Sequence, residues 1–199
     1  MVFLTSELMF KYKDYGDPKG KIRRLVKEGK LFPVVKGIYE DDKHVDPMYL
    51  APWICSPSYL SFDYALSLYG MIPETAYNYT SASFGKRKTK IYETAFGVYT
   101  YQDVPKAVYS YGVKSEINGS YSYHIATREK ALADKLYSLP PIRNMKEFSY
   151  MLFEDLRIYE EEFRALNMDD ILFLAPLYHS TNLDLLSKLV TGRGNGKRN

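Results

Sequence analysis

Seven lysines and arginines lie in one short stretch near the amino end of the sequence. Residues 18–37 hold these seven cations and one acid, Glu28, which gives the stretch a charge of +6, whereas the whole chain of 199 residues carries +3. Clustered cations bind phosphate oxygens, the contact that supplies much of the affinity of proteins for nucleic acids. A run of charges by itself more often marks only a solvated, exposed face. The elements that carry these cations must therefore decide between a solvated face and a phosphate-binding surface. The cations are Lys19, Lys21, Arg23, Arg24, Lys27, Lys30 and Lys36.

This stretch is expected to begin with a helix that has one apolar and one cationic face. Pro18 suits the first helical turn, and Gly29 suits a left-handed residue just past the end. Between them, Ile22, Leu25 and Val26 are spaced so that they share one face. The arginines and lysines then point to the other side, where a phosphate backbone could reach them.

The flanking segments predict a helix-turn-helix with a wing. A short helix is expected to start with Thr5 as its N-cap and to end at the turn of residues 16–18. Residues 31–35 and 37–39 are apolar and predict a hairpin that turns near Lys36. Helix, turn, basic helix and hairpin is the order of a winged helix-turn-helix, which would place the arginines in a major groove. Double-stranded DNA is therefore the expected partner.

The whole chain predicts an α+β protein with two domains and a tail. Residues 1–45 would form a winged helix-turn-helix DNA-binding domain, because acids and a polar, proline-containing linker follow the basic stretch. Residues 46–191 would form an α/β domain with a small, mainly antiparallel sheet and C-terminal helices. Residues 192–199 would be a disordered basic tail, since they carry nothing that could be buried.

Periodicity locates the elements of the larger domain. Alternating β-branched and aromatic residues predict strands, and apolar residues three and four apart predict helices. Thr127 is expected to cap one of these helices. The expected strands are 76–83, 90–101 and 121–125, and the expected helices are 62–69, 128–137 and several between 145 and 190.

Composition places few limits on function. With 46% hydrophobic and 26% charged residues the chain resembles an ordinary folded soluble protein. The single Cys55 excludes an internal disulfide and suits a reducing compartment. The longest strongly apolar stretch, 171–178, is too short to cross a bilayer. We expect a cytoplasmic protein without a membrane partner.

A second group of cations lies between the first two expected strands. As a hairpin tip it is most often only a soluble loop, but it could also bind a second phosphate or an acidic partner. An RNA-binding module that used this loop with some of the 20 tyrosines is one alternative function. The group consists of Lys86, Arg87, Lys88 and Lys90.

A nuclease-like enzyme is the other alternative. Glu93, Glu129, Lys130 and Asp134 could form a carboxylate and lysine cluster, although solvated ion pairs explain such residues more often. His44, His124 and His179 lie far apart without acids or a cysteine at ligand spacing, so no metal motif is present. Residues 192–197 imitate a phosphate-binding loop with the wrong spacing. We therefore expect no catalytic residue, no cofactor and no metal.

Four segments together resemble a known family. They are GKIRRLVKEGKLFPVVKGIYE, PSYLSFDYALSLYGMIPE, TSASFGKRKTKIY and IATREKALADKLY, in that order. The sequence from Leu4 to Tyr137 resembles the AbiEi family of antitoxins, which belong to type IV toxin–antitoxin systems. None of the four segments is specific alone, but the ordered set is.

The resemblance implies a function in two parts. An N-terminal winged helix would repress the protein's own operon, with Lys19, Lys21, Arg23, Arg24, Lys27 and a wing near Lys36 on the DNA. An α/β domain would counteract an AbiEii-like nucleotidyltransferase toxin without forming a stable complex. Tyr39 corresponds to an aromatic residue that closes the wing.

One departure from the family concerns the first helix. The helix that usually precedes the helix-turn-helix is absent, because Thr5 already starts the second helix of the pattern. The small core would then be covered either by the second domain or by another protomer. Oligomeric state and operator sequence stay open at this point.

Overall fold

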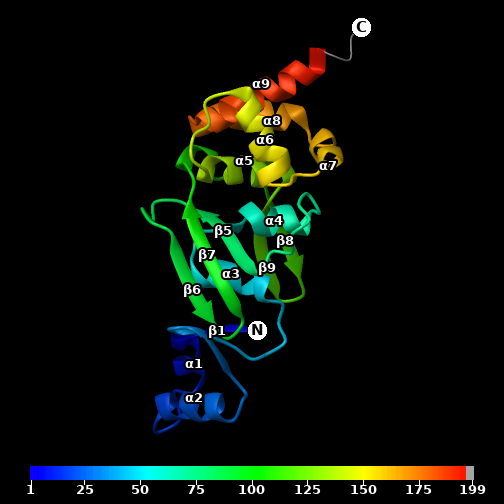
Figure 1. Cartoon of the computed structure of the whole chain (residues 1–199). Helices are drawn as coiled ribbons and strands as arrows, with labels where there is room; N and C mark the ends of the chain where they lie inside the picture. Colours follow the sequence, from blue (N-terminus) through cyan, green and yellow to red (C-terminus); the bar gives the residue numbers. More distant parts are fainter. Residues whose placement is uncertain (196–199) are drawn as a thin grey trace.

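The protein is a mixed α/β molecule of the α+β class. The computed structural model describes residues 1–195, and within this range the strands form two separate sheets. A small unit with one sheet lies at one end, the larger sheet lies in the middle, and a layer of helices lies at the other end (Figure 1). The chain runs through these three parts in that order.

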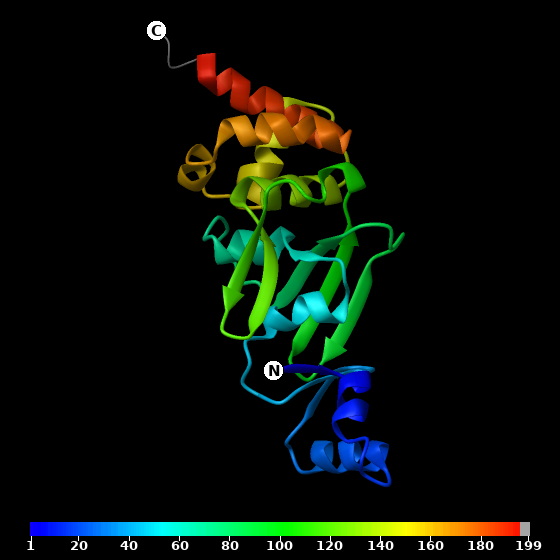
Figure 2. The same cartoon turned by 180° about the vertical axis from the view of Figure 1, so that it is seen from behind.

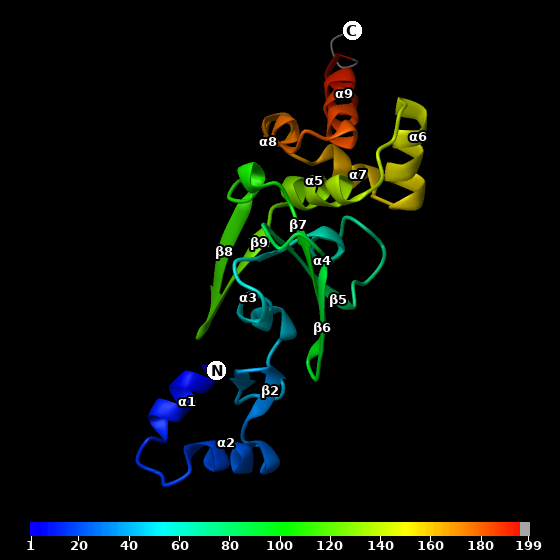
Figure 3. The ribbon, with the colours of Figure 1, turned by 90° about the vertical axis from the view of Figure 1, so that its left-hand side faces the viewer.

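The small unit has the element order strand, helix, helix, strand, strand. Its three strands form an antiparallel sheet in which β3 lies between β1 and β2. The two helices lie on the far side of this sheet from the rest of the molecule (Figure 3). The bounds are β1 Val2–Leu4, α1 Thr5–Lys11, α2 Pro18–Lys27, β2 Phe32–Val35 and β3 Ile38–Glu40.

Local signals explain the ends of α2. The Asp17 carboxylate caps the first turn and accepts the backbone N–H of Gly20 at 2.8 Å. Pro18 occupies the first helical position, and Gly29 takes a left-handed φ of 67° just past the end. The expected position of α2 is therefore confirmed.

The start of α1 differs from the expectation. Leu4 is the N-cap residue, and Thr5 is already helical. The Leu4 N–H is bound by the side chain of Glu7 at 2.8 Å, whereas the Thr5 hydroxyl donates to the Gly37 carbonyl at 3.2 Å. The hydroxyl that was predicted to cap the helix thus holds α1 to the β2–β3 turn instead.

Two hydrophobic clusters stabilise the small unit from its two sides. Leu8, Ile22, Leu25 and Leu31 form a core between its helices and its sheet. Val2 and Val34 on the sheet belong instead to the main core of the molecule. The rest of the same chain therefore covers one face of the small sheet, whereas the small core lies on the opposite face.

The larger sheet has six strands in the order β6-β7-β5-β4-β9-β8. The pairs β4–β5, β6–β7 and β8–β9 are antiparallel, whereas β4–β9 and β5–β7 are parallel. Three of the five pairs are antiparallel, which agrees with the prediction of a mainly antiparallel sheet, and the two parallel pairs join strands that are not consecutive in the chain. The bounds are β4 Tyr59–Leu60, β5 Asn78–Ser83, β6 Lys90–Thr94, β7 Gly97–Asp103, β8 Val113–Asn118 and β9 Tyr121–Ala126.

Two strand predictions need correction. The expected strand 90–101 is two strands, because a turn at Ala95 and Phe96 separates β6 from β7 and Gly97 adopts a φ of 131°. Strand β8 was not predicted, because its residues 114–118 are polar or exposed and show no buried alternation. It forms one edge of the sheet by pairing with β9.

Two of the short helical segments beside the sheet are bound by tyrosine hydroxyls of β7. Tyr99 and Tyr101 on β7 donate to the carbonyls of Pro47 and Ala51 at 2.8 and 2.7 Å. Figure 3 shows α3 between the two edges of the sheet. The segments here are the 3₁₀ turn η1 Pro47–Leu50, α3 Ala51–Ile54, α4 Phe62–Leu68 and the 3₁₀ turn η2 Lys106–Val108.

Helix α5 connects the sheet to the helical layer. It runs over Arg128–Ser138 and packs against α4, α8 and α9 (Figure 2). The Thr127 hydroxyl caps it by accepting the Lys130 N–H, as predicted. The following elements are α6 Met145–Tyr150, the π-helical turn η3 Met151–Asp155, α7 Glu160–Arg164, α8 Met168–Leu174, the 3₁₀ turn η4 Ala175–Tyr178 and α9 Thr181–Asn195.

The disordered tail expected over residues 192–199 overlaps the end of the last helix. Helix α9 extends to Asn195, so residues 192–195 are helical, while residues 196–199 lie outside the described range. Among the described residues, no helix combines the length and apolar character that spanning a bilayer requires.

Candidate nucleic-acid interface

The cations of α2 lie on the exposed side of the helix. Ile22 and Leu25 are only 4% and 9% exposed and face the small core. Arg23, Arg24 and Lys27 are exposed on the opposite side. The predicted division of α2 into an apolar and a cationic face is therefore confirmed.

Few of these cations are neutralised by acids. Arg23 lies 3.9 Å from Asp17, and both side chains are exposed, so this pair is weak. Lys30 donates to Glu28 at 2.8 Å, and this contact lowers the pKa of Glu28 while it raises the pKa of Lys30. Among the side chains that the structure describes, five of the seven cations have no ion pair, and these are Lys19, Lys21, Arg24, Lys27 and Lys36.

A shallow hollow lies between α1, α2 and β3. Thr5, Lys19, Ile22, Arg23 and Tyr39 line it. Tyr39 is half-buried and packs against the small core, in agreement with a structural role. The hollow brings two of the predicted cations to one place on the surface.

Lys36 in the expected wing and Lys21 in α2 differ in exposure and in contacts. Lys36 is exposed in the turn between β2 and β3, next to Gly37 with a φ of 91°. Lys21 is half-buried, and its ammonium lies 5.3 Å above the ring of Tyr15. Lys21 thus has an aromatic contact and is less free to reach a phosphate than its neighbours.

The structure adds two cations that the sequence reasoning missed. Lys11 ends α1 and Lys13 lies in the turn before α2, and both are exposed. Their ammonium groups lie 5.4 Å from the ring of Phe3 and 5.0 Å from the ring of Phe10. Both lysines lie in the first helix and turn of the predicted helix-turn-helix, and this position in the sequence could have identified them.

The second basic loop does not extend this surface. It precedes β6 at the end of the larger sheet that lies away from α2 (Figure 1). Lys86 donates to the Ser56 carbonyl at 2.9 Å, and the Arg87 N–H donates to Asp103 at 2.8 Å. Lys88 is exposed and Lys90 is half-buried. These contacts give the loop a structural role of its own.

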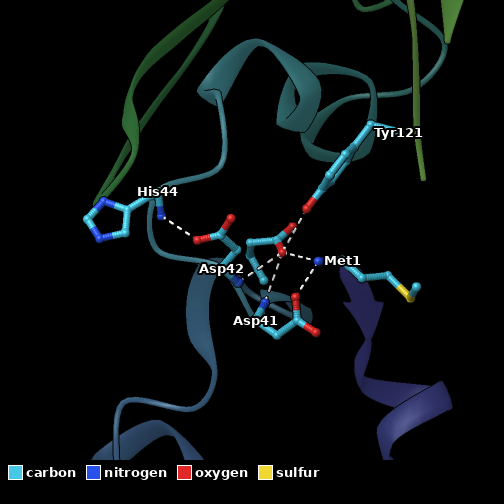
Figure 4. A network of polar contacts seen from close by, with 6 residues as sticks. Met1, Asp41, Asp42, His44 and Tyr121 are labelled. Carbon is cyan, nitrogen blue, oxygen red and sulfur yellow. Dashed lines mark hydrogen bonds and ion pairs between the residues drawn. The ribbon is translucent and has the colours of Figure 1, made fainter. Parts of the chain in front are cut away.

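A buried carboxylate joins the small unit to the larger sheet. Glu40, at the end of β3, is fully buried, and its Oε1 accepts the Tyr121 hydroxyl of β9 at 3.0 Å. The same oxygen accepts the N–H groups of Asp41 and Asp42 and binds the Met1 ammonium (Figure 4). Burial and the Glu40 carboxylate raise the pKa of Tyr121. This network ties the start of β1 and the end of β3 to β9.

The residues of the nuclease alternative are only partly brought together. Lys130 and Asp134 are fully buried in α5, and their Nζ and Oδ1 atoms lie 3.1 Å apart. Glu129 accepts the Asn167 N–H at 2.9 Å, whereas Glu93 lies on the edge strand β6. Burial lowers the pKa of Lys130 against the effect of Asp134. The buried pair is enclosed by protein rather than open to a substrate.

Hydroxyl groups complete the surroundings of Asp134. Tyr59 and Ser61 donate to its Oδ2 at 2.9 and 2.7 Å, and Tyr178 donates to its Oδ1 at 2.5 Å. Lys130 in turn donates to the Tyr178 oxygen at 2.6 Å. Within residues 1–195, no group of three or more histidine, cysteine, aspartate or glutamate side chains is arranged to hold a metal ion.

Comparison of the sequence with protein-family models and with curated proteins gives no match.

Proposed function

We propose that the protein is a DNA-binding autorepressor whose α2 lies in the major groove of its operator. The observation that carries this proposal is the cationic face of α2, which is exposed and largely free of acids while its apolar face is buried. The element order of the small unit supports its interpretation as a winged helix-turn-helix that lacks the usual first helix. In this arrangement α2 is the recognition helix and the β2–β3 turn with Lys36 is the wing.

The position of α2 in the molecule supports the same interpretation. It lies at the end of the molecule opposite the C-terminal helices (Figure 1). The acids Asp41 and Asp42 lie on the other side of the small sheet, at the junction (Figure 4). A duplex on α2 would therefore meet cations and avoid the larger domain.

We extend the proposal to the second half of the expected function. By its resemblance to the AbiEi family, the larger domain would counteract a nucleotidyltransferase-like toxin of a type IV toxin–antitoxin system. It would do so without a stable complex and without chemistry of its own. Co-expression with the product of the adjacent gene tests this part: growth should be restored, and no restoration would refute it.

Binding of the duplex upstream of the protein's own gene tests the DNA-binding part. Fluorescence anisotropy should show that the Arg23→Ala, Arg24→Ala, Lys27→Ala triple variant binds at least about tenfold more weakly, because charged contacts to phosphates are lost. Equal binding by the variant and the unaltered protein would refute the proposal.

A matched control separates location from net charge. The Lys86→Ala, Arg87→Ala, Lys88→Ala triple variant loses the same number of charges from the second basic loop. It should bind the duplex as the unaltered protein does. If the loop variant instead lost its affinity for nucleic acid, and lost more of it for single-stranded RNA than for the duplex, the RNA-binding alternative would replace the repressor.

A further inference from the structure

Strand β8 leaves one of its two backbone edges unpaired. It is an end strand of the larger sheet, and among the described residues it pairs only with β9 (Figure 3). The Thr127 N–H donates to the Gly112 carbonyl at 2.7 Å just before β8, and hydrogen-bonded positions alternate along an antiparallel pair. Residues 113, 115 and 117 therefore direct their N–H and C=O groups away from β9, to the open edge.

The side chains of this edge strand are exposed and without charged partners. An open edge attracts further strands, and charged side chains commonly protect it. Lys114 and Glu116 are both exposed, and neither has an ion pair within the described residues. Ile117 is a large apolar residue that is 81% exposed. Charges of opposite sign protect an edge poorly, because an incoming strand can meet each of them with its opposite.

The sequence of β8 is complementary to itself in one antiparallel register. When Ser115 of one copy lies opposite Ser115 of another, Lys114 of each copy lies opposite Glu116 of the other. In the same register, Val113 of each copy lies opposite Ile117 of the other. Opposite charges and apolar side chains directly across two strands stabilise their pairing, whereas like charges destabilise it.

This register agrees with the direction of the backbone groups. Because Ser115 directs its N–H and C=O groups outward, the two central serines would exchange both hydrogen bonds. Lys114 and Glu116 would then occupy the non-hydrogen-bonded positions, where opposite side chains lie closest. Moving the centre by one residue in either direction would place like charges opposite each other. The charges of β8 thus favour the register centred on Ser115.

The opposite edge of the sheet lacks this complementarity. Strand β6 has the sequence KIYET, with Tyr92 at its centre. In an antiparallel pair of two copies centred on Tyr92, Ile91 would lie opposite Glu93, and Lys90 opposite Thr94. No apolar pair and no pair of opposite charges would form there.

From these observations we infer that β8 is an interaction surface for a second copy of this chain. The two strands would pair about a two-fold axis through Ser115, so that the larger sheets of both copies become continuous. Because the pairing is antiparallel, the small units of the two copies would point in opposite directions, and α2 would stay exposed in both. The inference therefore does not depend on the proposed DNA binding.

Sedimentation equilibrium of the full chain over a series of concentrations tests this surface. The unaltered protein should show a monomer–dimer equilibrium. Lys114→Glu and Glu116→Lys each place like charges opposite each other at two positions, so each should weaken dimerisation at least about tenfold. Glu93→Lys makes the same kind of change on the exposed face of β6 and should leave dimerisation unchanged.

Mixing the two single variants is the sharpest test. At residues 114 and 116 one variant carries only glutamates and the other only lysines, so every pair in a heterodimer joins opposite charges. The equimolar mixture should therefore dimerise about as strongly as the unaltered protein, which would also show that both variants are folded. The inference would be overturned if the unaltered protein stayed monomeric, if both single variants dimerised as it does, or if the mixture associated no more than either variant alone.

Discussion

At the scale of single residues, the buried pair of Lys130 and Asp134 is the most demanding feature of the fold. Both side chains are 0% exposed, and each has other polar partners. A buried ion pair costs much desolvation and is tolerated only when its remaining groups are satisfied. Here three hydroxyl groups satisfy Asp134, so we interpret the pair as a structural connection between α5, β4 and η4.

Replacing one member of this pair should be costly. Asp134→Asn is expected to lower the free energy of unfolding by about 3–5 kcal/mol, because it leaves the Lys130 ammonium buried without a counter-charge. Lys130→Met should cost less, since the Asp134 carboxylate keeps its hydroxyl donors. Urea unfolding measures both changes.

An exposed pair with the same spacing provides the control. Glu160 and Arg164 are also four residues apart, but their side chains are 53% and 63% exposed. Glu160→Gln should change the free energy of unfolding by no more than about 0.5 kcal/mol. If Asp134→Asn were as mild as this control, the structural interpretation of the buried pair would be wrong.

At the scale of elements, the contact of β3 with β9 determines how firmly the small unit is held. Tyr121→Phe removes the hydroxyl that donates to Glu40 and should cost about 1.5–3 kcal/mol, the range for a hydrogen bond to a charged group. Amide hydrogen exchange in β1, β2 and β3 should become faster, because local opening of the small unit becomes easier.

Tyr123 on the same strand is the matched control. Its ring packs against Tyr49, and its hydroxyl makes no hydrogen bond within the described residues. Tyr123→Phe should leave exchange in the small unit unchanged. Equal exchange rates in the Tyr121→Phe variant and the unaltered protein would show that Glu40 does not hold the unit.

The elements also show what the sequence could predict. The ends of α2 follow from Asp17, Pro18 and Gly29, and the start of α5 follows from Thr127, because capping is a local property. Strand β4 has two residues, and the parallel pairing of β4 with β9 joins distant segments. Such pairing depends on tertiary contacts that no local pattern contains.

The same difference applies to the candidate sites. The cations of α2 lie in one continuous stretch, so the sequence was sufficient to identify them. The hollow lined by Thr5, Lys19 and Tyr39 combines residues from α1, α2 and β3, and only folding brings them together. The residues of the nuclease alternative show the opposite case, because Lys130 and Asp134 are close in sequence on α5 but are buried against distant tyrosines.

At the scale of the whole molecule, buried tyrosines make the fold sensitive to alkali. Burial raises the pKa of Tyr59, Tyr99, Tyr101 and Tyr178 above the ordinary value of 10.0. A group whose pKa is raised in the folded state contributes stability below its unfolded pKa and loses it as pH rises. Lys130, whose pKa burial lowers, acts in the opposite direction but is only one group.

Stability should therefore decrease steeply above about pH 10. Each tyrosine that ionises only in the unfolded state should contribute about 1.4 kcal/mol per pH unit. Urea unfolding at increasing pH measures the slope of the free energy of unfolding against pH. Tyr99→Phe should make this slope smaller by the contribution of one tyrosine. A free energy of unfolding that stays constant through this range would contradict the burial of these hydroxyls.

The charge distribution over the whole molecule underlies the central claim. Most of the chain is nearly neutral, and the excess of positive charge belongs to the small unit at one end. Phosphate contacts release condensed counterions, so each contact steepens the dependence of DNA affinity on salt. The number of contacts made by α2 can therefore be measured directly.

The decisive measurement is the salt dependence of binding to the upstream duplex, compared between the unaltered protein and the Arg23→Ala, Arg24→Ala, Lys27→Ala triple variant. The account predicts that the slope of log K against log salt concentration becomes shallower by about 2.7 in the variant, because each lost phosphate contact removes about 0.9. An unchanged slope, or a duplex affinity that does not depend on salt, would contradict the assignment of α2 as the DNA-binding helix.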